Sequence, residues 1–443
     1  MLNISKGALW AIKKLKDNGY EAYCVGGSIR DLLMGREVSD FDITTNATPE
    51  QMKAVFVGER IFETGIKHGT LTVVFEKEPL EITTYRKDGE YDDNRHPKSV
   101  EFASALKDDL SRRDFTVNAL AYDPISDTLV DLFGGINDIK NQILRAIGVP
   151  QERFTEDALR ILRGARFSSQ LGFEIEPETK RAMLECAPLL ENISKERIAI
   201  EINKLVCGKN AKNAILENCE LLAFVIPEIG KMNGFDQKNS WHIYDILTHT
   251  ACVVDNTPPI LHLRLAALLH DVGKVYTFTV DDNGVGHFYR HNAVSEKIAR
   301  AFFNEYKYDN LTKDKCCNLI SVHDTHIEAD KIYIKKRLNR MGKEAFFDLI
   351  IIQRADNLSQ NPEKVNMSHF DEVERLANEI LSEQECFSLK NLAINGNDLI
   401  AFGFSAGRQI GEILAFLLSE VIEERIQNEK QSLLQLAKAK FGG

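Results

Sequence analysis

The feature that most constrains the fold of this chain is a change in the spacing of its apolar residues near residue 137. Before that point, short β-branched segments alternate with turns, which predicts strands at residues 21–25, 41–44, 70–75, 80–85 and 129–132. After it, apolar residues recur every three or four positions, as in Ala158, Ile161 and Leu162, and the strand pattern almost vanishes. The pattern therefore predicts a small mixed sheet with flanking helices, followed by an all-helical region.

The 443 residues are too many for one hydrophobic core and should form about three or four domains. The hydrophobic content of 44% and the charged content of 27% are those of a globular protein. No apolar run approaches the roughly 18 residues needed to span a membrane. The N-terminus lacks a secretion signal, so we expect a cytoplasmic protein with no membrane partner. Its eight cysteines are scattered without a Cys-x-x-Cys pair and are expected to be reduced thiols.

The net charge of −11 argues against indiscriminate binding to nucleic acid, but it leaves room for a local basic track. Basic residues crowd a stretch of about fifty positions: Arg145, Arg153, Arg160, Arg163, Arg166, Lys180, Arg181, Lys195 and Arg197. A solvated helical face is the alternative explanation for this track.

Two short motifs near the N-terminus combine a glycine turn with paired carboxylates. The turn spans residues 26–31, and Asp40-Phe41-Asp42 follows nine residues later. Residues i and i+2 of a strand project to one face, so Asp40 and Asp42 can hold a pair of Mg²⁺ ions while Phe41 enters the core. The amides of Gly26, Gly27 and Ser28, which lead into a helix, can donate to a triphosphate. Either motif alone would be read as a surface turn, whereas together they indicate nucleotidyl transfer.

Three later segments extend this candidate site. Glu81 lies in a predicted strand and is either a third carboxylate for the ions or an ordinary surface position. Arg112 and its neighbour Arg113 can bind phosphates in bidentate fashion. Asp114 and Asn118 can hold the ribose hydroxyls.

The segment 156–163 is predicted to be one helix, on which Asp157 and Arg160 share a face. An intrahelical ion pair is the simpler explanation for this spacing. The chemistry also suits base recognition, because a carboxylate accepts and a guanidinium donates. Such a pair matches cytosine and adenine, which present an exocyclic amine beside an unprotonated ring nitrogen, and it rejects guanine and uracil.

In order and spacing, these motifs resemble those of class II tRNA nucleotidyltransferases, the CCA-adding enzymes, and of their bacterial poly(A) polymerase relatives. The segments concerned are residues 26–31, 40–42, 112–121, 156–160 and 194–197, so the resemblance covers roughly the first 210 residues. It implies that Asp40 and Asp42 hold Mg²⁺, that Arg112, Asp114 and Asn118 contact sugar and triphosphate, and that Asp157 and Arg160 select the base. We also place Arg30 and Arg163 among the nucleotide-binding residues.

The implied reaction is template-independent addition of CCA to the tRNA 3′ end from CTP and ATP, with release of pyrophosphate. The segment 91–97 resembles the loop of enzymes that add the terminal adenosine. A poly(A) polymerase remains an alternative. A phosphohydrolase whose N-terminal region only docks RNA is a third possibility.

Eight of the eleven histidines lie between residues 242 and 326. Six residues in this region and just beyond it form a potential ligand set: His249, His270, Asp271, His291, His323 and Asp356. Imidazole and carboxylate together suit Mn²⁺, Ni²⁺, Fe or Zn²⁺. Residues 269–274 and 289–292 resemble HD-domain phosphohydrolases, which implies hydrolysis of phosphomonoesters or cyclic phosphodiesters. A vestigial, structural module is the alternative.

The predicted fold class is α+β, with a polymerase-β-type nucleotidyltransferase head at residues 1–137. A helical neck and body at 138–230, an HD domain at 231–380 and a helical tail at 381–443 complete the predicted order. In the tail, glycines at 403, 407 and 411 open a long helix beside Arg408. They either hold an RNA phosphate or allow close helix packing.

Overall fold

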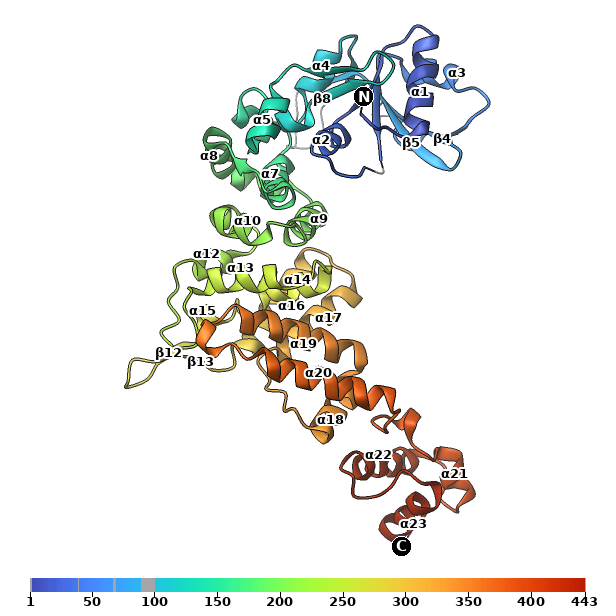
Figure 1. The fold of residues 1–443 in the computed structure, drawn as a ribbon, viewed down its shortest axis with the longest axis vertical. Helices are drawn as coiled ribbons and strands as arrows, with labels where there is room; N and C mark the ends of the chain where they lie inside the picture. The colour runs from blue at the N-terminus through green and yellow to red at the C-terminus, as the bar shows by residue number, and fades with distance from the viewer. Residues whose placement is uncertain (1, 39, 67–68, 89–99, 443) are drawn as a thin grey trace. The chain divides into compact units, whose positions relative to one another are not determined.

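The computed structural model describes residues 2–38, 40–66, 69–88 and 100–442. The chain forms two compact units, Met1–Gly230 and Lys231–Gly443, which are treated separately below (Figure 1). Within the described ranges, no helix is long and apolar enough to cross a membrane. All eight cysteines are free thiols, as predicted, and only Cys207 is not buried.

The first unit contains a mixed seven-stranded sheet, and the alternating segments predicted five of its strands, without β3 and β8. Its strand order is β3-β4-β5-β2-β1-β8-β9, and only the β2–β5 pair is parallel. The strands are β1 (Ala22–Val25), β2 (Asp42–Thr45), β3 (Arg60–Phe62), β4 (Thr70–Phe75), β5 (Glu78–Thr84), β8 (Leu120–Asp123) and β9 (Thr128–Asp131). Short pairs outside this sheet are β6 (Arg86–Asp88) with β7 (Val100–Phe102), and β10 (Ile143–Leu144) with β11 (Glu174–Ile175).

The two faces of this sheet carry different side chains. Cys24 and Ile43, which are paired across β1 and β2, join the core packed against the N-terminal helix, and Phe41 lies in the same core. Val25 points the other way, into a cluster with Leu110 and Ala121. Asp42 pairs with Val25 in the strand register, so strand alternation places it on that second face, away from Phe41.

Helices of the first unit flank the sheet and then follow it in sequence. They are α1 (Lys6–Asp17), α2 (Gly27–Leu33), α3 (Pro49–Val55), α4 (Leu106–Ser111), α5 (Gly135–Asn141), α6 (Pro150–Glu156), α7 (Leu159–Leu171), α8 (Pro177–Cys186), α9 (Lys195–Val206), α10 (Ala211–Glu217), α11 (Cys219–Leu222) and α12 (Pro227–Met232), which reaches into the second unit. Ser5 caps α1 by accepting a hydrogen bond from the Ala8 amide at 3.0 Å. Ala8, Ile12 and Leu15 then bury one stripe of α1 on the core.

The second unit is helical apart from one small hairpin, β12 (Phe278–Val280) and β13 (Gly286–Phe288). Its helices are α13 (Ile246–Asn256), α14 (Leu261–Leu269), α15 (Lys274–Thr277), α16 (His291–Glu305), α17 (Asn310–Val322), α18 (Lys331–Met341), α19 (Lys343–Leu358), α20 (Met367–Ser382), α21 (Gly396–Ala401), α22 (Arg408–Ile422) and α23 (Lys430–Phe441). The last three share a hydrophobic cluster that includes Leu399, Leu417 and Leu433. The predicted predominance of helices after residue 137 is confirmed, apart from the two short strand pairs β10–β11 and β12–β13.

Candidate functional site

Two of the three predicted carboxylates lie on adjacent parallel strands, and Asp40 precedes the first of these strands. Asp42 begins β2, and its register partner on β5 is Glu81, so the two side chains belong to one face of the sheet. Desolvation raises the pKa of the Asp42 carboxyl, and the charge of Asp40 raises it further while Arg113 opposes the shift. A carboxylate destabilised by its surroundings is stabilised by a bound cation, so this edge suits a divalent ion.

The glycine turn follows β1 directly. Gly26 precedes α2 with φ 80° and ψ −142°, a conformation that favours glycine. A Cβ at Gly26 would also lie 2.9 Å from Nη1 of Arg113. The hydroxyl of Ser28 donates inward to the Val25 carbonyl at 3.1 Å and so does not donate to a ligand. The turn thus brings backbone amides and Arg113 together.

A cavity of about 580 Å³ opens beside this turn within the first unit. Its lining includes most of the predicted nucleotide-binding residues, namely Gly26, Gly27, Arg30, Arg112, Asp114, Asn118, Asp157, Arg160 and Arg163, together with Asp42. Ser28, Asp40 and Glu81 are not among the lining residues. The cavity therefore gathers side chains from the sheet, the turn and the following helices into one site.

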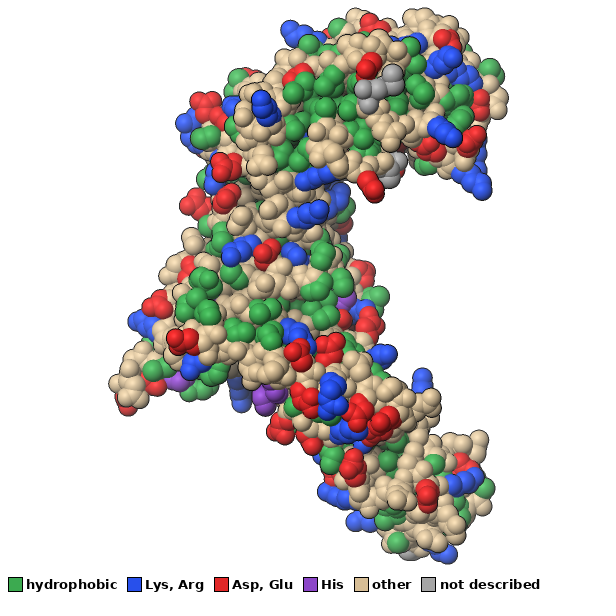
Figure 2. All heavy atoms as spheres, viewed as in Figure 1, with side chains coloured by type: hydrophobic (Ala, Val, Ile, Leu, Met, Phe, Trp, Pro, Cys, Tyr) green, Lys and Arg blue, Asp and Glu red, His purple; other side chains and the backbone are tan. Residues whose placement is uncertain are grey.

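Cations dominate this cavity, with nine basic and three acidic side chains in its lining. Figure 2 shows Lys and Arg side chains gathered in the region of α7 and α9 on the face in view. Burial lowers the pKa of Arg166 to about 10, which still leaves it charged at neutral pH. Such a surplus of positive charge suits a polyphosphate ligand.

Seven lining residues were missed as candidates for the nucleotide site: Arg86, Leu159, Arg166, Phe167, Gln170, Arg197 and Lys204. Arg166 and Gln170 follow Arg163 on α7 at helical spacing, and Lys204 lies seven residues after Arg197 on α9. These spacings place the α7 residues on one helix face and the α9 residues on another. They were the sequence pattern from which these residues could have been predicted.

Asp114 is the centre of a buried network. It is only 5% exposed and accepts hydrogen bonds from the Phe115 amide at 2.8 Å, Asn118 Nδ2 at 3.0 Å and Arg163 Nε at 2.7 Å. Desolvation would raise its pKa, but Arg163 and Asn118 outweigh that effect and lower the pKa to about 2. Arg30 also donates to Asn118 Oδ1. Asp114 is therefore an ionised acceptor whose position is already set.

The predicted continuous helix over residues 156–163 is wrong. Helix α6 ends at Glu156, Asp157 is extended with φ −135° and ψ 99°, and α7 begins at Leu159. The Asp157 carboxylate accepts from the Leu159 amide at 3.2 Å, so a short polar side chain replaces a helical acceptor. Asp157 and Arg160 reach the same cavity from a junction between two helices.

The ion pair considered between Asp157 and Arg160 is replaced by other partners. Arg160 is 7% exposed, and its Nη1 donates to Glu156 Oε2 at 2.7 Å and to the Arg153 carbonyl at 3.0 Å. Its Nη2 donates to the Arg112 carbonyl at 2.7 Å. Asp157 instead lies 3.5 Å from Nη2 of Arg197. Since a guanidinium carries five N–H groups, Arg160 is held firmly and keeps donors for a ligand.

Two other predicted contacts have different outcomes. The segment 91–97, which we associated with adenosine addition, lies outside the described residues. In the tail, Arg408 is almost fully exposed and its Nε lies 3.2 Å from Glu412 Oε1 on the same helix. Its contact with RNA stays a prediction.

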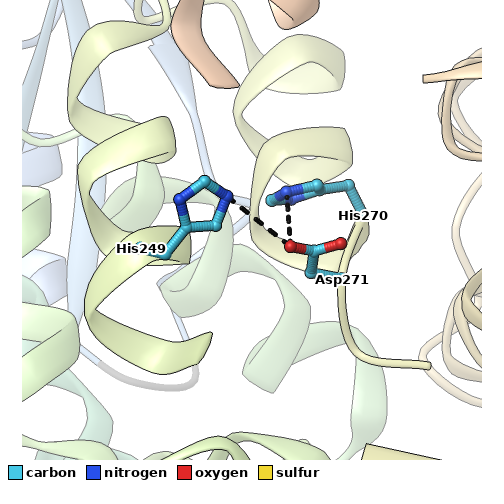
Figure 3. Close-up of side chains that lie close together, drawn as sticks. All are labelled: His249, His270 and Asp271. Carbon is cyan, nitrogen blue, oxygen red and sulfur yellow. Dashed lines mark ion pairs between the residues drawn. The ribbon is translucent and has the colours of Figure 1, made fainter. Parts of the chain in front are cut away.

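The six predicted metal ligands converge in the second unit. Figure 3 shows His249 on α13 directed toward His270 and Asp271, which follow α14. His291 begins α16, His323 follows the last residue of α17, and Asp356 lies on α19. His249, His270, Asp271 and His323 are buried.

Each of the four histidines has its Nδ1 next to a backbone carbonyl. The acceptors are Ser359 at 3.2 Å for His249, Ala267 at 2.7 Å for His270, Phe288 at 2.9 Å for His291 and Ile320 at 2.7 Å for His323. A carbonyl can only accept, so it places the proton on Nδ1 and leaves a lone pair on Nε2. This is the arrangement that orients histidine ligands of metals.

The Nε2 atoms meet around Asp271. His249 and His270 lie 3.6 and 3.2 Å from its Oδ2, whereas His291 and His323 lie 3.3 and 3.7 Å from its Oδ1. Asp356 Oδ1 is 2.9 Å from His249 Nε2. Two groups with metal-ligand spacing therefore share Asp271: His249, His270 and Asp271, and Asp271, His291 and His323.

Several of these buried atoms lack a hydrogen bond, namely Nε2 of His249, Nε2 of His270 and both carboxylate oxygens of Asp271. Although desolvation opposes it, electrostatic interaction with His270 and with the Lys274 ammonium holds the pKa of Asp271 well below its ordinary value. The Lys274 ammonium, 2.7 Å from Asp271 Oδ2, compensates only one of these acceptors. Buried acceptors that lack a partner are costly unless a cation binds to them. The ligand set therefore fits a divalent ion.

Known proteins resemble this chain over nearly its whole length. It is 32% identical to the CCA-adding enzyme of Enterococcus faecalis over 437 residues, which cover 98% of this chain and 96% of that protein. It is 48% identical to the CCA-adding enzyme of Bacillus licheniformis over 208 residues, or 47% of this chain and 52% of that one. The crystal structure of the Bacillus stearothermophilus CCA-adding enzyme in complex with CTP matches with a TM-score of 0.75 and 30% identity, covering 98% of this chain and 96% of that one.

Family models give the same result by region. The "Poly A polymerase head domain" matches residues 22–145, and the "Probable RNA and SrmB- binding site of polymerase A" matches residues 172–232. A model of the tRNA nucleotidyltransferase domain 2 matches residues 287–437. Taken with the full-length relatives and the nucleotidyltransferase head followed by helices, these matches show that the chain belongs to the CCA-adding enzyme family of tRNA nucleotidyltransferases.

Proposed function

We propose that this protein adds cytidine, cytidine and adenosine to the 3′ end of tRNA, using CTP and ATP and releasing pyrophosphate. The cation-lined cavity that has Asp42 in its wall carries the proposal, because it brings a metal-binding carboxylate and a polyphosphate site together. The family relationship adds the identity of the RNA and of the nucleotides.

Different residues of the first unit would bind the metal ions and the triphosphate. The terminal RNA hydroxyl attacks the α-phosphorus of the nucleotide in line, and pyrophosphate leaves. Nucleotidyltransferases of this kind use divalent ions, and we assign Mg²⁺ to Asp40, Asp42 and Glu81, where it would neutralise charge on the attacking and leaving oxygens. Arginines of the cavity, including Arg30, hold the triphosphate.

Ribose and base are recognised in the same cavity. Asp114, ionised and fixed by Arg163, accepts from the ribose hydroxyls, and Asn118 positions it. Asp157 and Arg160 present an acceptor and a donor to the base edge, which admits cytosine and adenine. The segment 91–97, which lies outside the described residues, would assist adenosine addition.

An incorporation assay tests this function. A tRNA transcript that ends at the discriminator base is incubated with Mg²⁺ and labelled CTP or ATP, separately and together. Two cytidines from CTP alone, and one further adenosine with both nucleotides, are expected. Long adenosine tails without CTP would identify a poly(A) polymerase, and no incorporation would leave only a phosphohydrolase with an RNA-docking head.

We also propose that the second unit is a metal-dependent phosphohydrolase of the HD type, active on phosphomonoesters or 2′,3′-cyclic phosphates. The convergence of four Nε2 lone pairs on Asp271 carries this proposal. Mn²⁺, Ni²⁺ and similar ions suit these ligands. A bound ion would polarise a water molecule and coordinate phosphate oxygens of the substrate. Hydrolysis and bound metal should both be lost in Asp271→Ala, and hydrolysis that persists in this variant would belong to a contaminant.

The boundary between the compact units at residue 230 supports the division we propose within the chain. The head would occupy residues 1–137 and the neck and body 138–230. The HD domain would follow at 231–380, and the tail at 381–443 would contact RNA. Such an order would let one chain trim a damaged RNA end and rebuild it.

A further inference from the structure

A lysine lies inside the histidine cluster although no ligand role requires it. Lys274 opens α15, and its side chain is only 7% exposed. Its Nζ lies 2.7 Å from Asp271 Oδ2, the oxygen that faces His249 and His270. Lysine is almost never fully buried unless its charge is compensated, so the position of this ammonium calls for a cause.

Most of the residues that hold the Lys274 ammonium in place are not metal ligands. Gln237, which is 1% exposed, accepts from Nζ at 2.9 Å, and the ring of Phe288 lies 5.2 Å from Nζ. Gly286 makes this packing possible, because a Cβ there would lie 2.2 Å from the Gln237 carbonyl oxygen. Lys274 can therefore keep its place when Asp271 turns to another cation.

The metal ligands are oriented without this lysine, since backbone carbonyls hold all four histidines. A metal ion bound to Asp271 Oδ2 would share that oxygen with the Lys274 ammonium. Two positive charges that contact the same oxygen repel each other. A lysine that served only metal binding would be counterproductive. Its charge is better explained by an anion.

A charge count within the cluster supports this reading. Asp271 and Asp356 together carry two negative charges, and the four Nε2-coordinating imidazoles are neutral. One divalent ion would make the ligand set neutral, and Lys274 then makes the occupied site positive. A neutral residue in its place would remove that attraction for an anion.

We propose that Lys274 is an anion-binding residue of the histidine cluster, held by Gln237 and Phe288 so that its ammonium contacts a phosphoryl oxygen of the substrate. This inference rests on the proposed phosphohydrolase function and names the group that binds the phosphate. Two opposite effects follow from one substitution. Removing the charge weakens phosphate binding and leaves metal binding equal or stronger.

The test uses full-length protein and two probes, Mn²⁺ alone and inorganic phosphate in the presence of Mn²⁺. Binding is measured by titration calorimetry and bound Mn²⁺ by elemental analysis. The phosphate isotherm of Asp271→Ala is subtracted, because the cavity of the first unit also binds anions. Lys274→Met should lower phosphate affinity about tenfold or more, as expected for loss of a charge-assisted hydrogen bond, without loss of Mn²⁺. Lys274→Arg, which keeps the charge, should stay near wild type.

Lys335→Met is the matched control, because Lys335 is a buried lysine of the same unit that pairs with Glu385 and Glu424. It should change neither isotherm. Loss of Mn²⁺ from Lys274→Met would show that the lysine only supports Asp271 and would overturn the inference, as would unchanged phosphate affinity. If Lys274→Met does not fold, Gln237→Leu decides by the same two criteria. Wild-type protein that binds no Mn²⁺ would instead refute the phosphohydrolase function itself.

Discussion

The cavity of the first unit and the histidine cluster of the second leave opposite kinds of buried atoms without a hydrogen bond. In the cavity these atoms are donors: Nε of Arg113, Nε of Arg166 and Nη1 of Arg197. In the cluster they are the acceptors Nε2 of His249, Nε2 of His270 and the oxygens of Asp271. Buried polar atoms of one kind identify the charge of the missing partner. The first site is therefore built for an anion and the second for a cation.

The largest effect is expected at Asp42, the carboxylate in the anion-binding cavity to which we assign a metal ion. Asp42→Ala removes a metal ligand, so incorporation of CTP should fall by a factor of about a thousand or more. Affinity for tRNA, measured by filter binding, should change little. Glu50→Ala, an exposed acid on α3, serves as the control. Near-normal turnover of Asp42→Ala would refute the metal assignment.

The corresponding change in the second unit is His270→Ala, which removes one lone pair and leaves Asp271 in place. Loss of one ligand from a site of this kind should lower metal affinity by about a hundredfold or more. Dialysis followed by elemental analysis measures the effect. His287→Ala is the control, because His287 pairs with Asp281 on the surface and is not in the ligand set. Equal metal contents of the two variants would contradict the cation site.

Arg160→Ala tests base recognition in the anion-binding cavity of the first unit, because we propose that this guanidinium donates to the base and not to a phosphate. Discrimination against UTP and GTP should fall by about ten- to a hundredfold, the usual range for one polar contact that reads a ligand. The ratios of kcat/KM for the four nucleotides measure it. Gln170→Ala, also in the cavity lining, should leave these ratios unchanged. Full rejection of UTP and GTP by Arg160→Ala would exclude the template role.

The buried anion of the cavity, Asp114, predicts a pH dependence. Its folded-state pKa of about 2 lies below the ordinary 3.8, so its stabilising effect is complete above pH 4 and is lost as the pH falls toward 2. The shift corresponds to about 2 kcal/mol of unfolding free energy. Asp114→Asn should lose that amount at pH 7 and approach wild type at pH 2.5. Urea unfolding followed by Trp10 fluorescence, with Trp241→Phe as background, reports on the first unit. A difference that does not depend on pH would contradict the assignment.

The smallest effect is expected in the tail, where Arg408 is exposed and its Nε lies 3.2 Å from Glu412 Oε1 on its own helix. Arg408→Ala should weaken tRNA binding a few-fold and reduce the salt dependence by about one charge if it contacts a phosphate. Arg375→Ala, a surface arginine paired on α20, is the control. Equal affinities of both variants at low salt would exclude a phosphate contact at Arg408. The packing explanation for the tail glycines is wrong, because a Cβ at Gly403, Gly407 or Gly411 would meet no described atom within 4 Å.

Local patterns predicted much of this molecule. The prediction that Phe41 and Asp42 face opposite ways is confirmed, with Phe41 in the core and Asp42 on the other face at the start of β2, because period-2 patterning depends only on neighbours in the strand. Strand β8 was missed since all four of its residues are buried and show no alternation. The break at Asp157 was missed because apolar periodicity continues across it while one side chain captures the Leu159 amide.

Long-range features could not be predicted. Arg160 depends on the carbonyl of Arg112, and His249 on that of Ser359, which is 110 residues away. Backbone carbonyls carry no sequence signature, so only the fold reveals such partners.

These carbonyls also limit how the histidine site can change over time. No side-chain substitution at Ser359, Ala267, Phe288 or Ile320 deletes the backbone oxygen that holds a ligand in place. The orientation of the four imidazoles is thus protected against most single mutations at its supporting positions. Divergence of this site in ion or substrate must instead come from the ligands themselves or from the wall around Lys274.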